Sequence, residues 1–424
     1  MTDTIFALSS GRPPAAVSVI RISGPIALEA GERLVGSLAP ARAAAVREVR
    51  RPDSGELLDR ALVLRFDGPA SATGEDTVEL QCHGGRAVVD ALLRVLAAMD
   101  GLREARPGEF TRRAFENRRI DLTEAEGLAD LIEAETETQR KAAMALAEGG
   151  LRRQIAEWQD RLLDLSAQAE RVIDYDEDDA ALDPQIEAGC EVLAAEFREW
   201  LDRPRVEPLK DGVLVVIAGP PNSGKSSLIN VIAGEERTIV TDVPGTTRDH
   251  IEVALSLGGV PIRLTDTAGL RDTDDRVEAI GVQRAAKLVS QADVLIWLGE
   301  PDEAPVQRGV LKVQSKADLP GRTISEDALP VSAVTQLGLA SLLRQIEAMA
   351  REVLPSEDRV ALNRRQAADI ADAAEALKMA SKAGEIVVIA EGLRVARSAF
   401  DRLTGRSGVE DVLDALFSRF CLGK

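Results

Sequence analysis

The octapeptide Gly219–Ser226, with the sequence GPPNSGKS, constrains this chain more than any other feature. It fits the pattern G-x-x-x-x-G-K-[ST], follows the apolar run Val213–Ile217 and precedes the helical-looking segment Ser227–Ile232. In this strand–loop–helix context the glycines let backbone N–H groups surround phosphate oxygens, and the N-terminus of the helix attracts negative charge. A nucleotide-binding α/β domain of the P-loop class is therefore predicted. A tight glycine-rich turn without a ligand is the alternative.

The polar residues of the octapeptide have predicted roles. Lys225 would reach the β- and γ-phosphates, and the Ser226 hydroxyl would bind Mg²⁺. Backbone N–H groups along the loop would hold the remaining phosphate oxygens. The predicted phosphate contacts are therefore Asn222, Ser223, Gly224, Lys225, Ser226 and Ser227.

Two further motifs would complete a site for magnesium and the γ-phosphate. Asp266 and Gly269 form a D-x-x-G element after the apolar stretch Val260–Leu264. Asp266 would hold Mg²⁺ through water, and the Gly269 N–H would contact the γ-phosphate. Thr246 and Thr247 lie between the two motifs, where a threonine can close over Mg²⁺ when the γ-phosphate is present. We expect Ser226, Thr247 and Asp266 to be the magnesium residues.

A last pair of motifs selects the base. Asp318, in the sequence Ser315-Lys316-Ala317-Asp318, can accept hydrogen bonds from N1–H and N2–H₂ of guanine, a donor pair that adenine lacks. Lys316 can lie along the plane of the base. The Ser332-Ala333 pair would supply a backbone N–H to the guanine O6. The ordered set of motifs predicts a Ras-like GTPase domain that binds GTP and GDP.

Two positions depart from the usual GTPase pattern. Leu270 follows Gly269, where Ras-like proteins have a glutamine that orients the attacking water. Hydrolysis must therefore use another group. Ser315 stands where GTPases usually have asparagine, and its short hydroxyl is expected not to span the gap between the base-recognition loop and the P-loop. Weakened nucleotide retention is the expected result.

Composition excludes several classes of protein. The chain has 424 residues, enough for two to four domains. No apolar stretch approaches the roughly 20 residues of a membrane helix, and the start lacks the regions of a signal peptide. Three separated cysteines and two histidines argue against zinc and against a disulfide framework. We expect a cytoplasmic protein that does not associate with membranes.

The charge is strongly acidic overall and unevenly distributed. The net charge is −19, which argues against simple nucleic-acid binding. Residues 1–119 hold 17 Arg and 16 Asp or Glu, a balance of +1, so the rest of the chain carries −20. If the protein contacts RNA, the arginine-rich stretch Arg103–Arg119 is the expected surface. A solvated surface of mixed charge is the alternative.

The pattern along the chain divides it into domains. Residues 1–118 mix strand candidates at Thr4–Leu8, Val17–Ile22, Ala61–Phe66 and Thr77–Cys82 with a helix at Arg86–Met99, and predict an α+β domain. Residues 119–208 have helical spacing that begins at a predicted capping box, Thr123-Glu124-Ala125-Glu126. Residues 209–355 would be the GTPase domain, inserted into a helical domain that residues 356–424 complete.

Several motifs far apart in the chain resemble one family. These motifs are Val19–Gly24, Val78–Gly85, Pro107–Phe115, Asp266–Arg271 and Phe420–Lys424. They resemble the MnmE (TrmE) family of tRNA-modifying GTPases, which ends in a similar Phe-Cys-[Ile/Leu]-Gly-Lys. The resemblance spans essentially the whole chain.

The resemblance implies a role beyond GTP hydrolysis. Members of the family act on tRNA with MnmG, a partner that contains FAD. Together they place an aminomethyl-type or carboxymethylaminomethyl group at C5 of the wobble uridine. Their N-terminal domain forms a homodimer and binds a tetrahydrofolate that carries a one-carbon unit. Matched by motif, the folate contacts would be Arg21, Glu79 and Arg119; a strand glutamate and surface arginines without a ligand are the alternative.

The resemblance also implies a route for hydrolysis. Potassium would replace an arginine finger, bound by Asn222 and by carbonyl groups of the loop that contains Thr241, Val243 and Thr246. Glu278 would orient the attacking water. Cys421 is a candidate for the chemistry because a thiolate can carry a one-carbon unit. A small buried residue that anchors the tail is an equally weighted interpretation.

A rival function shares the whole GTPase signature. A ribosome-assembly or translation GTPase would act as a binding switch without modification chemistry. Such a switch needs neither the N-terminal domain nor the tail with Cys421, and these two features favour the tRNA-modifying function.

Overall fold

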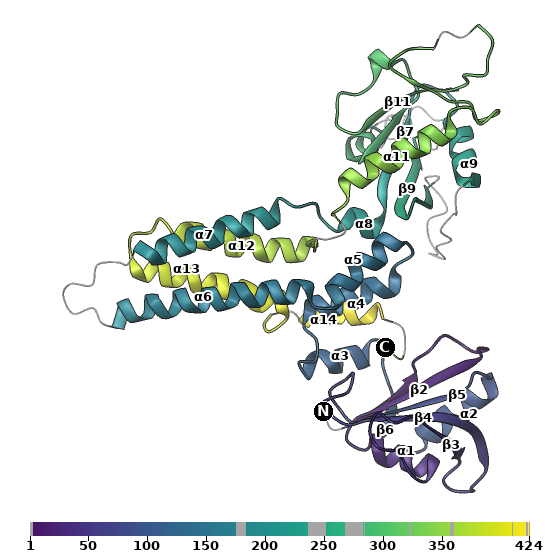
Figure 1. Cartoon of the computed structure of the whole chain (residues 1–424), viewed down its shortest axis with the longest axis vertical. Helices are drawn as coiled ribbons and strands as arrows, with labels where there is room; N and C mark the ends of the chain where they lie inside the picture. Colours follow the sequence, from purple (N-terminus) through teal and green to yellow (C-terminus); the bar gives the residue numbers. More distant parts are fainter. Residues whose placement is uncertain are drawn as a thin grey trace. The chain divides into compact units, whose positions relative to one another are not determined.

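A computed structural model describes residues 3–174, 184–235, 252–267, 283, 285–321, 324–356, 360–408, 410–420 and 423 (Figure 1). The chain forms two compact units. The first combines Met1–Ala129 with Asp401–Lys424, and the second is Asp130–Phe400. In the described residues, no helix combines the length and the apolar character that crossing a membrane requires.

The first unit contains a six-stranded sheet in the order β3-β4-β5-β2-β1-β6. Neighbouring strands are antiparallel except β1 and β6, which are parallel. Two helices follow strands of the sheet directly: α1 (Ala27–Val35) and α2 (Arg86–Ala97). The strands are β1 (Thr4–Leu8), β2 (Val17–Ser23), β3 (Ala45–Arg50), β4 (Leu57–Phe66), β5 (Thr77–His83) and β6 (Leu102–Glu104).

The two faces of this sheet differ. Ile20 and Ile22 are fully buried in one apolar cluster with residues of α1 and α2, so the helices cover that face. Arg21 lies between these isoleucines, and side chains alternate along a strand. Arg21 therefore belongs to the opposite face, where Ile5 and Phe110 form a smaller cluster. The helix-covered face forms the core of this unit, and the other face has room for polar groups.

The last residues of the chain pack on the first unit. Helix α14 (Glu410–Ser418) lies against α3 (Glu109–Glu116), with the rings of Phe115 and Phe417 6.4 Å apart. Gly108 has φ +69°, and a Cβ there would lie 2.3 Å from the Phe417 carbonyl oxygen. This close approach requires glycine, so the Pro-Gly before α3 is a packing requirement as well as a helix start.

The predicted capping box lies two residues too late. Helix α4 spans Leu122–Glu133, and the Asp121 carboxylate accepts a hydrogen bond from the Glu124 N–H at 3.0 Å. The Glu124 carboxylate in turn accepts from the Asp121 N–H at 2.8 Å. Asp121 is thus the cap, and the Thr123 hydroxyl donates to its carboxylate. The prediction was wrong because aspartate caps as well as threonine does.

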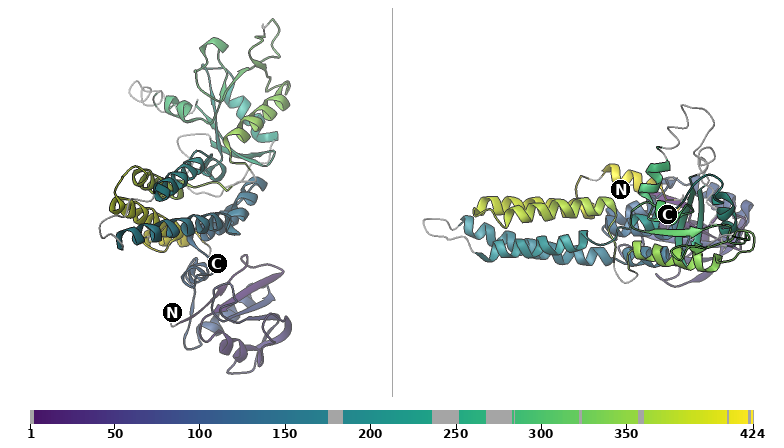
Figure 2. Two further views of the ribbon diagram at one scale, coloured as in Figure 1. Left: turned by 60° about the vertical axis from the view of Figure 1, so that its left-hand side comes forward. Right: turned by 90° about the horizontal axis from the view of Figure 1, so that it is seen from above.

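Helices of the second unit surround an aromatic core. The ring of Trp158 lies 4.9 Å from that of Phe197, 5.2 Å from that of Trp200 and 5.8 Å from that of Phe400. Phe400 comes from a helix that follows the GTPase domain in sequence, so the helical pieces on both sides of that domain pack together (Figure 1, Figure 2). The aromatic residues belong to α6 (Gly150–Asp174), α7 (Pro184–Leu201) and α13 (Ile386–Thr404). Two more helices of this unit are α5 (Glu137–Ala147) and α12 (Arg364–Ala380).

The inserted domain is a six-stranded sheet in the order β12-β11-β10-β7-β9-β8, parallel except for the β8–β9 hairpin. Val215 and Val216 are both fully buried although they point to opposite faces, because both faces of β7 are covered. The fold class predicted from the sequence is confirmed. The elements are α8 (Glu207–Asp211), β7 (Val213–Ala218), α9 (Lys225–Glu235), β8 (Glu252–Leu257), β9 (Val260–Asp266), β10 (Val294–Trp297), β11 (Val310–Gln314), β12 (Leu329–Pro330) and α11 (Leu339–Val353).

A buried ion-pair network holds the first unit together. Arg113 is 0% exposed and donates to Asp3 and Glu75, each at 3.0 Å, and to Glu109 at 3.4 Å. Arg103 also pairs with Asp3 and Glu109. Arg103 and Arg113 are thus engaged inside the unit, and the buried Arg113 cannot belong to an RNA-contacting surface.

This network makes the first unit sensitive to acid. Burial alone would raise the pKa of Glu109, but hydrogen bonds from Arg103 and the Arg106 N–H hold that pKa below its ordinary value of 4.5. A folded-state pKa below the unfolded one contributes stability above about pH 4.5, and this contribution is lost as the pH falls through the folded value.

We predict that Glu109→Gln lowers the stability of the first unit at pH 6 by about 2 kcal/mol, because a charged hydrogen-bond acceptor is lost. The variant should also lose less stability than wild type on acidification to pH 3. The tryptophans all lie in the second unit, so protection of β1 and β2 amides against hydrogen exchange is the suitable measurement, compared at equal pH. Glu116→Gln, at a half-exposed pair with Arg112, is the control; an equal acid response in all three proteins would contradict the prediction.

Candidate functional site

The P-loop connects the end of β7 to the start of α9. Gly219 and Gly224 have φ angles of +152° and +93°, which L side chains rarely adopt. A Cβ on Gly219 would also lie 3.1 Å from Leu298, at the end of the neighbouring strand. Asn222 has φ +60° and is exposed. Asparagine tolerates this left-handed conformation better than most residues, which explains its presence in so tight a loop.

Lys225 is folded into this loop. Its side chain is buried, and its Nζ donates hydrogen bonds to the carbonyl oxygens of Gly219 at 3.0 Å and Pro220 at 2.9 Å. The ammonium group is therefore fixed within the turn that would surround the phosphates. A positive charge held there, together with the N-terminus of α9, fits a polyphosphate.

Two of the three predicted magnesium residues meet: Ser226 in the first turn of α9 and Asp266 at the end of β9. The Ser226 hydroxyl donates to Asp266 Oδ2 at 2.9 Å, and Asp266 is 1% exposed. Thr267, the next residue, is fixed by its own hydroxyl, which donates to the Ile217 carbonyl at 3.0 Å. A hydroxyl and a carboxylate are hard oxygen donors of the kind that Mg²⁺ prefers. The arrangement fits the ion.

The base-recognition loop is joined to the P-loop, contrary to the sequence-based expectation for Ser315. The Ser315 hydroxyl donates to the Ser223 carbonyl oxygen at 2.5 Å, so serine does span the gap. Beside it, Lys316 Nζ donates to the Asn222 carbonyl oxygen at 2.7 Å. The expectation was wrong because it assumed the wider separation that an asparagine side chain would fill. Here the two backbones approach closely enough for a hydroxyl.

The remaining base-recognition residues lie close to this loop in sequence or structure. Asp318 is exposed, so its carboxylate can meet a ligand. Ser332 is fully buried, its N–H donates to the Leu337 carbonyl at 2.9 Å, and its hydroxyl accepts from the N–H of Thr335 at 3.1 Å. Ser332 therefore shapes the turn, and the N–H expected to face guanine is that of Ala333.

A cavity of about 400 Å³ adjoins the P-loop and the base-recognition loop. Its lining includes Asn222, Ser223, Ser315 and Lys316. The Ser223 hydroxyl is buried without a hydrogen-bond partner in the described structure, which marks the loop as a place where a polar ligand group could bind. Seven predicted residues lie outside the described residues: Thr241, Val243, Thr246, Thr247, Gly269, Glu278 and Cys421.

The two strongest folate candidates form an ion pair on the open face of the first unit's sheet. Arg21 of β2 and Glu79 of β5 are direct cross-strand neighbours, and Arg21 Nε lies 2.9 Å from Glu79 Oε1. The Arg21 guanidinium also lies 5.4 Å from the ring centre of Phe110. Arg119 is exposed and lies beside Gly74, where a Cβ would be 3.2 Å from its Cγ. The structure thus brings Arg21 and Glu79 together with an aromatic ring.

Two of these features escaped the sequence-based predictions. The sequence does not indicate that Phe110 lies beside Arg21, or that the Ser223 carbonyl oxygen is the partner of the Ser315 hydroxyl. Both depend on contacts between residues far apart in the chain, and neither position has a local signal beyond an aromatic or a small polar side chain.

Comparisons with known proteins agree across the whole chain. A family model for the helical domain of MnmE matches residues 122–421, and a model for the N-terminus of the GTP-binding protein TrmE matches residues 4–119. The tRNA modification GTPase MnmE of Rhizorhabdus wittichii is 52% identical, with 100% of this chain and 97% of that protein covered. That of Novosphingobium aromaticivorans is 49% identical over 100% of both chains.

Other relatives and the solved structures complete the comparison. The tRNA modification GTPase MnmE of Erythrobacter litoralis is 51% identical over 100% of both chains. Among solved structures, the G domain of the T. maritima FeoB iron transporter covers 32% of this chain and 98% of its own, at 26% identity and a TM-score of 0.25. The assignment rests on the full-length relatives and the family models. This chain belongs to the MnmE family of tRNA modification GTPases.

Proposed function

We propose that this GTPase acts with MnmG, a partner that contains FAD, to place an aminomethyl or carboxymethylaminomethyl group at C5 of the wobble uridine of certain tRNAs. The observation that carries the proposal is the Arg21–Glu79 pair beside Phe110, in the unit that matches the TrmE N-terminus. GTP turnover alone needs no such site. The pair offers a second, chemically different place for a ligand in the same chain.

The residues of this pair suit a tetrahydrofolate. Glu79 can accept hydrogen bonds from the N–H edge of a pterin, Arg21 can bind carbonyl or carboxylate oxygens, and Phe110 can pack on a ring. Tetrahydrofolate, when bound, would supply the one-carbon unit. Arg21 and Glu79 are 23% and 17% exposed, so a ligand can reach both. Arg119 would approach from the end of α3.

Other parts of the proposal follow the family. The N-terminal domain would form a homodimer, and the protein would work in the cytoplasm. The domain boundaries proposed are 1–118, 119–208, 209–355 and 356–424. Cys421 would carry a one-carbon unit or anchor the tail, and both roles stay open. Gly423, two residues later, approaches β1 so closely that a Cβ there would lie 1.9 Å from the Leu8 carbonyl oxygen.

Hydrolysis of GTP would use a potassium ion in place of an arginine finger. Lys225, Ser226 and Asp266 would hold the phosphates and Mg²⁺, with Thr247 and Gly269 joining when the γ-phosphate is present. The Asn222 side chain and the loop with Thr241, Val243 and Thr246 would bind potassium, and Glu278 would orient the water. Asp318, Lys316 and Ala333 would select guanine.

The modification proposal is tested in a strain that lacks this protein. Mass spectrometry of wobble uridines should show loss of the C5 group, and wild-type protein should restore it. Glu79→Ala should fail to restore the modification. Glu48→Ala, at another glutamate paired with arginines in the same sheet, should restore it.

A binding measurement separates the folate site from GTP turnover. Calorimetry with a tetrahydrofolate derivative should show binding to wild type and to Glu48→Ala but not to Glu79→Ala or Arg21→Ala, while all four hydrolyse GTP. If the wobble uridines of the deletion strain keep the C5 group, the proposed function is refuted. Intact folate binding by both site variants would place the folate elsewhere.

The link between the two nucleotide loops should slow release of GDP. Ser315→Ala removes the hydrogen bond to the Ser223 carbonyl, which contributes about 1 kcal/mol, so release should accelerate roughly fivefold. Stopped-flow displacement of fluorescent GDP measures the rate. Ser290→Ala, which removes a hydrogen bond on an exposed surface, is the control. A rate equal to wild type in Ser315→Ala would show that this link does not retain nucleotide.

The potassium mechanism predicts a dependence on the cation. At matched ionic strength, wild type should hydrolyse GTP roughly tenfold or more faster in potassium than in sodium, since an ion held at the phosphates stabilises developing charge. Asn222→Gly, which keeps the left-handed backbone and removes the side chain, should abolish the difference. Glu278→Ala should lower kcat with little effect on KM. The mechanism is refuted if wild type works equally fast in both salts.

A further inference from the structure

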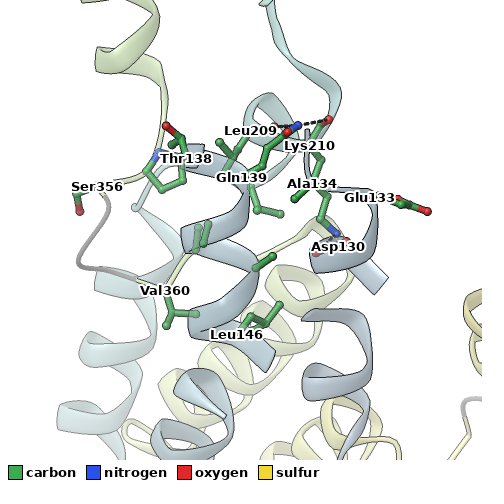
Figure 3. A pocket seen from close by; sticks show the side chains of 15 residues that line it. Asp130, Glu133, Ala134, Thr138, Gln139, Leu146, Leu209, Lys210, Ser356 and Val360 are labelled. Atoms are coloured by element: carbon green, nitrogen blue, oxygen red, sulfur yellow. Dashed lines mark hydrogen bonds and ion pairs between the residues drawn. The ribbon is translucent and has the colours of Figure 1, made fainter. Parts of the chain in front are cut away.

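Helix α5 touches the inserted GTPase domain at its entry point (Figure 3). Gln139 Nε2 donates to the carbonyl oxygen of Leu209 at 3.0 Å and to that of Lys210 at 3.4 Å. Gln139 Oε1 accepts hydrogen bonds from the N–H groups of Glu135 and Thr136, each at 2.9 Å. One side chain therefore caps α5 and binds α8, and α8 leads directly into β7 and the P-loop.

A salt bridge reinforces this attachment of α8. Lys210 Nζ lies 2.6 Å from Asp130 Oδ2, and the carboxylate side chain is only 10% exposed. Ion pairs that are partly removed from water are less screened than surface pairs. Together with Gln139, this pair holds both the backbone and the side chains of α8 against the α4–α5 region (Figure 3).

The same turn of α5 touches a second part of the GTPase domain. The β8–β9 hairpin turns at Gly258 and Gly259, with φ angles of +55° and +84°. A Cβ on Gly259 would lie 3.9 Å from Thr138 Oγ1 and 4.0 Å from Glu137 Cβ, both on α5. On its other side the Gly258 carbonyl accepts a hydrogen bond from Arg351 of α11 at 2.6 Å. The hairpin is thus held between α5 and α11.

The two contacts join α5 to elements that lead to the predicted nucleotide-binding residues. Strand β8 follows residues 236–251, which contain the predicted switch threonines, and β9 ends at Asp266, the predicted magnesium residue. Helix α8 leads to the P-loop. Any displacement of these elements that accompanies gain or loss of the γ-phosphate therefore acts on the first turn of α5.

The body of α5 is not tightly packed where it meets the domain. A cavity of about 70 Å³ lies between α5, α8 and the segment around Val360, lined largely by small apolar side chains of which Ala142 and Ala143 belong to α5 (Figure 3). Ala142 also packs on the apolar core of the GTPase domain. Close-packed interiors resist displacement, so unfilled space here leaves α5 room to change position.

We propose that α5 couples the nucleotide site to the helical segment, with Gln139 and the β8–β9 turn as its two contact points. Helix α6 begins three residues after α5 ends, so a shift of α5 passes into the long helices that surround Trp158. Coupling is reciprocal. Fixing α5 against the hairpin must therefore change the relative affinity for GTP and GDP.

A reversible disulfide crosslink between α5 and the β8–β9 turn tests the proposed coupling. The Cβ separation of 4.0 Å between positions 137 and 259 suits a disulfide, so the variant is Glu137→Cys with Gly259→Cys, in a Cys421→Ser background. Cys82 and Cys190 are buried and remain. Comparing the oxidised and reduced forms of one protein cancels any strain that the cysteine at position 259 introduces.

Amide hydrogen exchange is followed in α5 and α6 with GDP and with a non-hydrolysable GTP analogue. The reduced form should show a nucleotide-dependent difference that the oxidised form loses. The ratio of the two nucleotide affinities should differ at least threefold between the two forms. An equal exchange difference and an equal affinity ratio in both forms would overturn the proposal, as would the absence of any nucleotide-dependent difference in wild-type α5.

A second variant tests the other contact without a crosslink. Gln139→Ala should reduce the nucleotide-dependent exchange difference in α6 by at least half. Gln154→Ala, at an exposed glutamine of α6 that bonds only weakly to Glu157, should preserve it. Equal differences in Gln139→Ala and Gln154→Ala would exclude Gln139 as a coupling residue.

Discussion

The parallel pairing of β7 with β9 is the constraint on which the nucleotide site depends. Its register sets Ile217 opposite Asp266, so the carboxylate stands beside the P-loop and accepts the Ser226 hydroxyl at 2.9 Å. Because side chains alternate along a strand, a slip of one residue would turn Asp266 to the other face of the sheet. The Thr267 hydroxyl, which donates to the Ile217 carbonyl oxygen at 3.0 Å, helps to fix this register and with it the position of the Asp266 carboxylate.

In the part of the chain that the structure describes, short links hold the loops that surround this point. Ser315 and Lys316 join the base-recognition loop to two successive carbonyl groups of the P-loop. Gln139 and the Lys210–Asp130 pair join the P-loop's strand to the helices through α8. Each link is one hydrogen bond or ion pair, worth little singly. Together they connect the candidate nucleotide site to helices that lie far from it in sequence.

Local patterns predicted a large part of this structure. Strand β1 has the predicted bounds, and the phosphate loop has the predicted strand and helix on either side. These elements have strong periodicity or a motif with its own backbone requirement. The cap was predicted at Thr123 instead of Asp121, because both residue types cap helices. The span of Ser315 was predicted wrongly because it depends on the distance between two backbones rather than on residue type. Helix α1 and strand β3 were not predicted.

The ion-pair network around Arg113 is a second kind of feature that the local sequence did not predict. Five charged side chains gather from the N-terminus, a loop, strand β6 and helix α3. Nothing in the local sequence distinguishes Arg113 from the exposed Arg118. The arginine-rich stretch Arg103–Arg119 was the expected surface for RNA. In the fold, however, Arg113 is buried and forms ion pairs with carboxylates. The family resemblance indicated Arg21 and Glu79 as ligand-binding residues. The local sequence did not, because a glutamate on a strand has no sequence feature that is specific to a ligand site.

The division of the first unit between the two ends of the chain has a consequence during synthesis. Its sheet is complete once residues 1–104 have emerged, but the partner of α3, with Phe417, belongs to Asp401–Lys424. The roughly 300 residues between residue 104 and Asp401 take about 15 to 60 s to translate at about 5–20 residues per second. Throughout that interval the face of α3 around Phe115 stays uncovered on the nascent chain. The packing of this unit is therefore completed only after the last residues of the chain have been synthesised.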